Sequence, residues 1–242
     1  MNGAARPPAR RARDTPSAYV MPLQLRDNLH WCESGGRIVF LDVAADRYFC
    51  LPSEANDSFL TLAAGKADRH DAERLRILTS RGLLVTSGSL DFFPQPPVVD
   101  HPTRDCLGNP TPRSGAVPAL RALAWEFRAA WQLKTQPFSE VIARARRSGL
   151  SQREAAGGSD PAIQSIAAAA DAVAFVTRSH NRCLVRGLAV HAACRARGIS
   201  AKLVLGVIAH PFAAHCWVQS GDAVLVGGYE HARLYTPILV IE

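Results

Sequence analysis

Residues 181–189 read NRCLVRGLA and residues 214–218 read AHCWV, and these two stretches decide how the second half of the chain folds. The first continues with a helical pattern to Gly198, a residue suited to a helix end, so that Cys183 falls in the first turn of a helix. The second is β-rich and carries His215 near its start. The sequence therefore predicts a helix that opens with a cysteine and packs on a sheet that carries a histidine.

This pair of residues has the chemistry of a nucleophile and its base. At a helix start the aligned peptide dipoles favour a thiolate at Cys183, and the free backbone N–H groups can hold an oxyanion. His215 is then the expected general base. Cys216 follows it but points to the opposite face of the strand, so we expect it to pack in the core. The alternative reading is that Cys183 and His215 are ordinary buried side chains.

The first half of the chain changes from strand-like to helix-like patterns. Leu75, Ile77 and Leu78 are expected to face a core from a helix over Asp71–Arg81, and Ser53 is placed to cap an earlier helix. Three β-rich runs separated by turn residues precede these helices, at Leu29–Glu33, Arg37–Val43 and Arg47–Leu51. A three-stranded sheet followed by helices predicts a winged-helix-like domain.

Residues 94–118 contain seven prolines and little hydrophobic periodicity, so we expect a linker without regular helix or sheet there. After it, Phe127 and Trp131 lie four residues apart in a predicted helix and are expected to be core aromatics, whereas Trp125 lies off their stripe. The fold class is α+β. The predicted parts are a disordered basic tail at 1–18, an N-terminal domain at 19–93, the linker at 94–118 and a C-terminal domain at 119–242.

Composition and charge indicate the cellular compartment and the classes of partner that we expect for this chain. Hydrophobic residues make up 48%, and no apolar run approaches the ~20 residues that a membrane-spanning helix needs. The net charge of +7 owes much to arginines in the tail, and no apolar stretch follows them, as an export signal would require. The six cysteines form no CxxC pair. We expect a cytoplasmic protein with reduced thiols and with neither nucleic-acid nor membrane partners.

The second half resembles the transglutaminase-like, or papain-like, cysteine proteases that remove leader peptides in lasso-peptide biosynthesis, with helices packed on an antiparallel sheet. The resemblance lies in RCL at 182–184, GI at 198–199, LGV at 205–207 and above all AHCWV at 214–218. The first half is similar to the leader-recognition domain of the same pathway, a relative of the small coenzyme-PQQ chaperone, through VFLD at 39–42 and DRYFCL at 46–51. Their order matches the fused form of the family's B protein.

By this resemblance Cys183 matches the nucleophile and His215 the base, and the family completes a triad with an Asp on the next strand. If Gly221 and Asp222 form the hairpin turn, His215 lies opposite Gly228, and no carboxylate is there. Asp222 is about 16 Å away along the strand, at ~3.3 Å per residue. Glu230 is closer to the position that the third triad residue would need, but no motif of the family supports it in that role. We therefore expect a backbone carbonyl or a distant side chain to orient the imidazole, and an inactive relative stays an alternative.

The resemblance also implies that a leader peptide adds as an extra strand beside Arg47–Leu51 and rests against the following helix. The leader-binding candidates are Arg47, Tyr48, Phe49, Cys50, Leu51, Leu75 and Leu78. A winged-helix DNA-binding role is the competing reading, but Asp71–Arg81 mixes acidic and basic residues and forms no basic stripe.

The function that the sequence predicts is a maturation protease that cleaves the leader from a ribosomally made lasso precursor without a cofactor of its own. Its partners are the precursor leader and an ATP-dependent, asparagine-synthetase-like enzyme that forms the lactam. Two alternatives are a non-catalytic scaffold that delivers the precursor and an acyl transferase that uses the same thiol. A zinc site built from Cys183, His191, Cys194 and His215 is also weighed, but its spacing matches no compact zinc motif, and we expect no metal.

Overall fold

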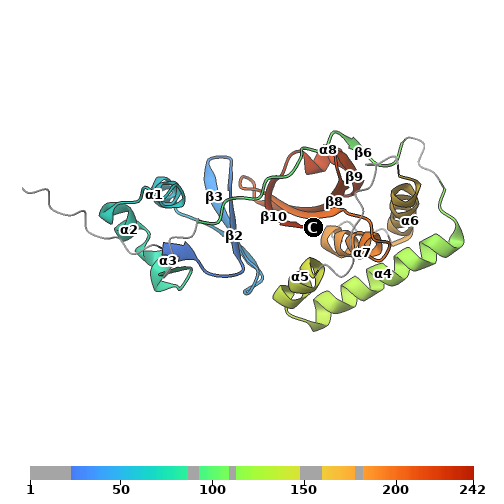
Figure 1. Cartoon of the computed structure of the whole chain (residues 1–242), viewed down its shortest axis with the longest axis horizontal. Coiled ribbons are helices and arrows are strands. Elements are labelled where there is room, and N and C mark those ends of the chain that lie inside the picture. The colour runs from blue at the N-terminus through green and yellow to red at the C-terminus, as the bar shows by residue number, and fades with distance from the viewer. Residues whose placement is uncertain (1–22, 87–92, 109–112, 148–159, 178–181) are drawn as a thin grey trace, which may run out of the picture.

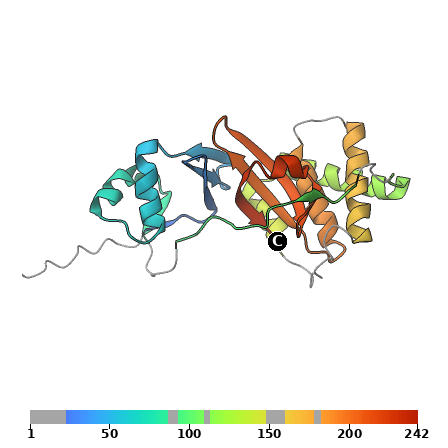
Figure 2. The same ribbon diagram turned by 90° about the horizontal axis from the view of Figure 1, so that it is seen from above.

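A computed structural model of the chain describes residues 23–86, 93–108, 113–147, 160–177 and 182–242, and the expected basic tail lies outside them. Figure 1 shows a smaller part with helices α1–α3 and strands β2 and β3, next to a larger part built on a second sheet. The segment that joins them runs along both parts, as the two perpendicular views in Figures 1 and 2 show. No helix in the described ranges combines the length and the apolar character that crossing a membrane requires.

The N-terminal part contains the expected three-stranded meander. Strands β2 (Leu29–Ser34), β3 (Arg37–Asp42) and β4 (Arg47–Cys50) pair antiparallel in chain order, within one residue of the predicted bounds. Gly35 and Gly36 make the first turn with positive φ angles of 55° and 72°, as a primed hairpin turn requires. A separate ribbon pairs β1 (Leu23–Leu25) with β5 (Leu84–Thr86).

The helices of this part differ from the prediction. After α1 (Ser53–Ala63), the expected single helix is divided at Leu75 into α2 (Arg69–Arg74) and α3 (Arg76–Ser80). Leu75 and Leu78, three residues apart, are buried, whereas Ile77 is 47% exposed, so its expected place in the core was wrong. The sheet and helices agree with an α+β fold, and the winged-helix arrangement stays a prediction.

The C-terminal part is built on a five-stranded sheet in the order β10-β7-β8-β9-β6. All neighbours are antiparallel except β6 and β9, which are parallel. The strands are β6 (Arg104–Asp105), β7 (Lys202–Ile208), β8 (Ala213–Ser220), β9 (Ala223–Val226) and β10 (Thr236–Ile241).

The proline-rich segment is more ordered than expected. Residues 104–105 form β6, and helix α4 (Ala116–Thr135) begins inside the range 94–118, so the expectation of no regular structure there was wrong. The physical reason at the helix is that Pro118 lies in the first turn, where a backbone N–H has no intrahelical partner to lose. The remaining helices are α5 (Phe138–Arg146), α6 (Pro161–Thr177), α7 (Cys183–Arg195) and α8 (Tyr229–Ala232).

Helix α4 faces the opposite way from the prediction. Phe127 is 74% exposed and Trp131 is 55% exposed, whereas Trp125 and Ala129 pack against the core. The helix is apolar on two sides, so its periodicity does not choose between them. The small Ala129 lies on the side packed against the core, and Glu126 on that side pairs with Arg186 of α7.

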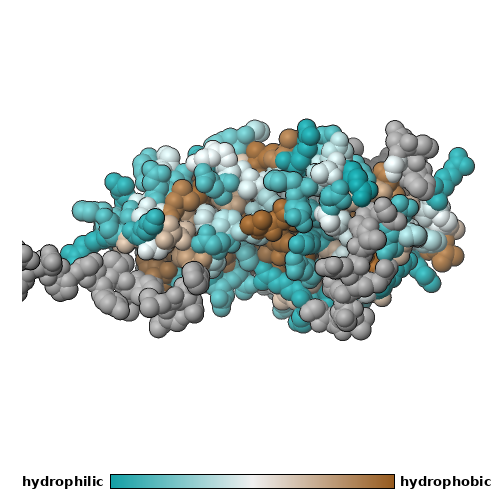
Figure 3. All heavy atoms as spheres, turned by 45° about the horizontal axis from the view of Figure 1, so that its top comes forward, coloured by the Kyte–Doolittle hydropathy of each residue, from teal (hydrophilic) through white to brown (hydrophobic). Residues whose placement is uncertain are grey.

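The two parts share one hydrophobic cluster, and the N-terminal part has a second cluster of its own. Along β3, Ile38 and Phe40 pack with α1 and α3, whereas Val39 and Leu41 belong to the cluster that includes β7, β8 and α7. The N-terminal sheet is therefore covered on both faces, which explains the unbroken apolar run at 38–41. On the outside, the face in Figure 3 shows hydrophobic residues as separate patches among hydrophilic ones.

Candidate active site

Cys183 lies where the sequence placed it, at the first residue of α7. Arg182 is the N-cap residue, and its side chain makes no capping hydrogen bond. The first turn of α7 contains no acidic residue. The backbone N–H groups of this turn have no intrahelical acceptors, and the helix dipole adds partial positive charge. The half-buried thiol of Cys183 therefore lies at an end of the helix that stabilises negative charge.

A glycine brings this helix close to the sheet. A Cβ atom at Gly187 would lie 2.7 Å from Sγ of Cys216 on β8, so any larger residue would push the helix away from the strand. Cys216 is buried on this face, as expected, and burial raises the pKa of its thiol well above the usual range. Close packing between α7 and β8 thus sets where Cys183 lies relative to the strand that carries His215.

His215 is half-buried on β8, and its ring is oriented by the backbone. Its Nε2 lies 2.9 Å from the carbonyl oxygen of Gly227, and the ring lies 5.2 Å from that of Tyr235 and 6.2 Å from that of His231. Because a carbonyl can only accept, Nε2 carries the hydrogen and Nδ1 is left able to take a proton. Burial lowers the pKa of His215, and the hydrogen bond to Gly227 opposes that effect.

Gly227 occupies the place where the family's carboxylate was expected. The hairpin turn pairs Ser220 with Ala223 as predicted, but a register shift then pairs Val218 with Val226, where the simple count had residue 225. Strand β9 ends at Val226, so it stops before the position that the count had set opposite His215. Gly227 has a φ of 111°, and a Cβ there would lie 2.5 Å from Cβ of Trp217. The backbone at this position leaves no room for an aspartate side chain.

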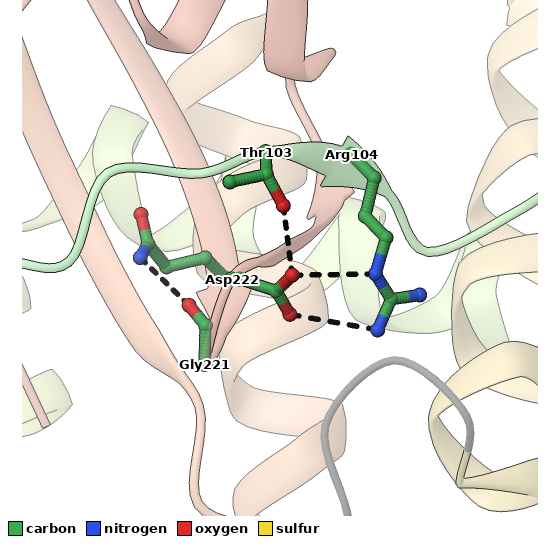
Figure 4. Close-up of polar contacts among 5 residues, drawn as sticks. Thr103, Arg104, Gly221 and Asp222 are labelled. Carbon is green, nitrogen blue, oxygen red and sulfur yellow. Dashed lines mark hydrogen bonds and ion pairs between the residues drawn. The ribbon is translucent and has the colours of Figure 1, made fainter.

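The two carboxylates weighed from the sequence make contacts elsewhere. Figure 4 shows Asp222 at the hairpin turn, where it accepts a hydrogen bond of 2.7 Å from Thr103 and pairs with Arg104 at 3.4 Å. The hydrogen bond from Thr103, helped by Arg104, lowers the pKa of Asp222. Glu230 is exposed and forms an ion pair with Arg233 at 3.2 Å. Asp222 thus ties the joining segment to the sheet.

Cys183 and His215 line one cavity of about 590 Å³. The ring's hydrogen bond goes to Gly227 and not to the thiol, and such catalytic contacts often tighten only when substrate is bound. The sequence analysis missed other polar groups that line this cavity. They are Asp105, Asp171, Arg186 and His231.

Arg186 is the one of these that the sequence could have indicated, because it follows Cys183 by three residues and so shares its helix face. Its Nε lies 3.7 Å from Oε1 of Glu126 on α4, a carboxylate only 4% exposed, and the guanidinium also donates to the carbonyl oxygen of Ala174. Burial raises the pKa of Glu126, and Arg186 opposes this. The pair fixes a cation at the wall of the cavity that contains the thiol.

The four proposed zinc ligands do not form a metal site. His191 and Cys194 are buried in the core, where burial lowers the pKa of His191 to about 4 and raises that of Cys194 to about 12. His191 lines a different cavity, between α4, α5 and α7. Within the described part of the chain, no group of three or more His, Cys, Asp or Glu side chains could hold a metal ion.

Four of the proposed leader-binding residues lie on β4, an edge strand of its sheet, and the other three follow it in the N-terminal part. Arg47 is exposed and lies over the ring of Phe49, at 5.7 Å from its centroid. Leu51, Leu75 and Leu78 are buried in the N-terminal core, so their side chains are closed to a peptide in this conformation. A role for these residues in peptide binding stays a prediction.

Tyr48 points the other way, toward the C-terminal part. Its ring lies 5.5 Å from that of Phe212, which precedes β8, and it packs against the shared core. Burial, followed by the nearby thiols of Cys216 and Cys183, raises the pKa of Tyr48. The edge strand of the N-terminal sheet and the start of the helix with the thiol are thus close in space.

Comparison with known proteins supports this description of the C-terminal part. Residues 123–240 match the model of a family described as the transglutaminase-like superfamily, and the match includes both Cys183 and His215. Searches of curated proteins and of solved structures found no match. A transglutaminase-like domain is compatible with cysteine protease or acyltransferase activity. The match does not extend to the N-terminal half.

Proposed function

We propose that this protein is a cysteine protease that removes the leader from a ribosomally made precursor peptide of the lasso type. The observation that carries the proposal is that Cys183, at the start of α7, and His215, oriented by Gly227, line the same cavity. A helix-start thiol and an imidazole of fixed tautomer are the two groups that nucleophilic cleavage of a peptide bond requires.

In the proposed reaction, Nδ1 of His215 takes the proton of the Cys183 thiol, and the thiolate attacks the scissile carbonyl carbon. Backbone N–H groups of the first turn of α7 stabilise the oxyanion. Collapse of the tetrahedral intermediate breaks the C–N bond, and the imidazolium gives its proton to the leaving amine. A water molecule, deprotonated by His215, then hydrolyses the thioester and frees the thiol.

Leader recognition is proposed at the open edge of β4, where an extended peptide adds as a fourth strand. Support comes from Tyr48, which reaches from this strand toward the thiols of Cys183 and Cys216. A leader bound at this edge lies against the C-terminal part, which contains Cys183 and His215. The freed amino terminus then passes to an ATP-dependent lactam-forming enzyme, as the family resemblance implies.

The test incubates purified protein with a lasso precursor peptide, sought among short reading frames beside its gene, and follows the peptide by mass spectrometry. We expect the precursor to be shortened by the wild-type protein and by Cys106→Ala, which removes a buried thiol outside α7. Cys183→Ala should leave the precursor intact. Binding without any change of mass in the wild type would contradict the proposal and identify a scaffold.

Acyl transfer is the second candidate, and the cavity offers one observation in its favour. Asp105 and Asp171 both line it, and two carboxylates can attract a protonated amine toward the acyl-enzyme. A gain in mass or a crosslink that depends on Cys183, in place of shortening, would identify transfer.

A further inference from the structure

Helix α4 presents an apolar stripe to solvent along most of its length. Its members are large hydrophobic residues spaced three or four positions apart, and each is between 45% and 74% exposed. They are Val117, Leu120, Leu123, Phe127 and Trp131. Contiguous exposed apolar residues of this size mark an interaction surface.

The stripe lies on the side of α4 opposite to the face that packs against the core. Trp125 and Ala129 pack against the core on the inner side, so the outer residues contribute nothing to that packing. At 1.5 Å per residue, the stripe is a straight ridge about 21 Å long. Figure 1 shows α4 at the border of the molecule.

The charges on α4 indicate what this surface contacts. Arg121 and Arg128 are exposed and follow one border of the stripe, and Lys134 is exposed near its end. The helix has a single acidic residue, Glu126, which is buried and paired with Arg186. A second copy of this chain would bring arginines against arginines, whereas an anionic surface complements them.

We propose that the outer face of α4 docks the protein on an anionic lipid surface. A stripe of Leu, Phe and Trp bordered by arginines is the composition of helices that lie in the headgroup region of a bilayer. The apolar residues enter the boundary between headgroups and acyl chains, Trp131 lies at the interface, and the arginines contact lipid phosphates. This proposal departs from the sequence expectation of no membrane partner, which considered only membrane-spanning helices.

The experiment is flotation of the purified full chain with vesicles of phosphatidylcholine alone or mixed with an equal part of phosphatidylglycerol. We expect binding to the anionic vesicles and a blue shift of Trp131 emission, since Trp31 and Trp217 are already buried and Trp125 packs against the core on the inner face of α4. The double variant Leu120→Ser, Phe127→Ser should bind about tenfold more weakly, as should Arg121→Glu, Arg128→Glu.

The matched controls lie outside α4. Leu234→Ser removes another exposed leucine, and Arg69→Glu, Arg81→Glu makes the same change of charge on exposed arginines of the N-terminal part, so both should bind like the wild type. Equal binding to neutral and anionic vesicles, or full binding by the stripe variant, overturns the proposal. So does a wild-type dimer, by light scattering, that the stripe variant converts to monomer, because a second copy would then cover α4.

Discussion

A backbone carbonyl orients the imidazole of His215 in this protein, at the place where the resemblance to leader-removing proteases implies an aspartate. The carbonyl oxygen of Gly227 lies 2.9 Å from Nε2 of His215. It fixes the tautomer as a carboxylate would, but it adds no negative charge to stabilise the imidazolium that forms during attack. The position of this oxygen depends on a glycine at a φ of 111° packed against Trp217.

We expect Gly227→Ala to lower kcat/KM for precursor cleavage by about 100-fold, because the new Cβ would overlap Trp217 and displace the carbonyl from His215. The matched control is Gly228→Ala. This position also has a positive φ, of 73°, but a Cβ there meets its nearest atom only at 3.6 Å, so the substitution adds backbone strain without the overlap. Equal losses in the two variants would argue that backbone strain, and not the contact to His215, matters.

The pH dependence of cleavage follows from the burial of His215. Burial lowers its pKa from 6.5, so the imidazole stays neutral, and able to accept a proton, to a lower pH than an exposed histidine. We expect the acidic limb of kcat/KM to have a midpoint below 6.5 and the rate to fall as pH drops through it. A pH profile with wild-type protein checks this, and a midpoint above 6.5 would point to a charged partner that stabilises the imidazolium.

At the scale of elements, α4 shows how tertiary contacts choose between two apolar faces. Trp125, on the inner face, packs against the core, whereas Trp131, on the outer face, is 55% exposed. A hydrophobic pattern specifies a buried face only when the other face is polar. Here the pairing of Glu126 with Arg186 of α7 distinguishes the inner side.

We expect Trp125→Ala to lower the free energy of unfolding by about 2–4 kcal/mol, because it removes a ring packed against the core. Trp131→Ala should change it by less than about 0.5 kcal/mol, since the side chain is mostly in water. Urea unfolding followed by circular dichroism compares the two. The reverse order of effects would mean that α4 turns its other face inward in solution.

At the scale of the whole molecule, the two parts of the chain are joined by packing as well as by the proline-rich segment. Val39, Leu41 and Cys32 of the N-terminal sheet belong to the same core cluster as Leu205 and Cys216 of the C-terminal sheet. Ser34 adds a hydrogen bond of 3.4 Å to the carbonyl oxygen of Val207. The distance between β4 and Cys183 is therefore set by contacts and not by a flexible tether.

Leu41→Ala tests this shared core. Leu41 is 1% exposed and faces the C-terminal part, so its truncation should lower the free energy of unfolding by about 2–5 kcal/mol in one transition that fluorescence and circular dichroism report together. Leu234→Ala, at a leucine 61% exposed, should have little effect. Two separate transitions, with only one shifted by Leu41→Ala, would show that the parts unfold independently.

The strand bounds of the N-terminal meander, the helix start at Cys183 and the strand with His215 were predicted from the sequence, because each depends on local turn residues and on alternation along a few positions. The division of the helix at Leu75 and the register shift beyond Val218 were not, since both result from packing against distant segments. Arg186 shares the helix face of Cys183, but only the fold pairs it with Glu126.

The sequence by itself determined which residues are the candidates for catalysis, because a thiol at a helix start and an imidazole on a strand are local features. Only the tertiary structure decided what surrounds them. It placed the carbonyl of Gly227 beside His215, turned Phe127 and Trp131 of α4 outward and joined the two parts through a shared hydrophobic cluster. These outcomes depend on contacts between segments far apart in the chain, and local patterns of hydrophobicity do not encode such contacts.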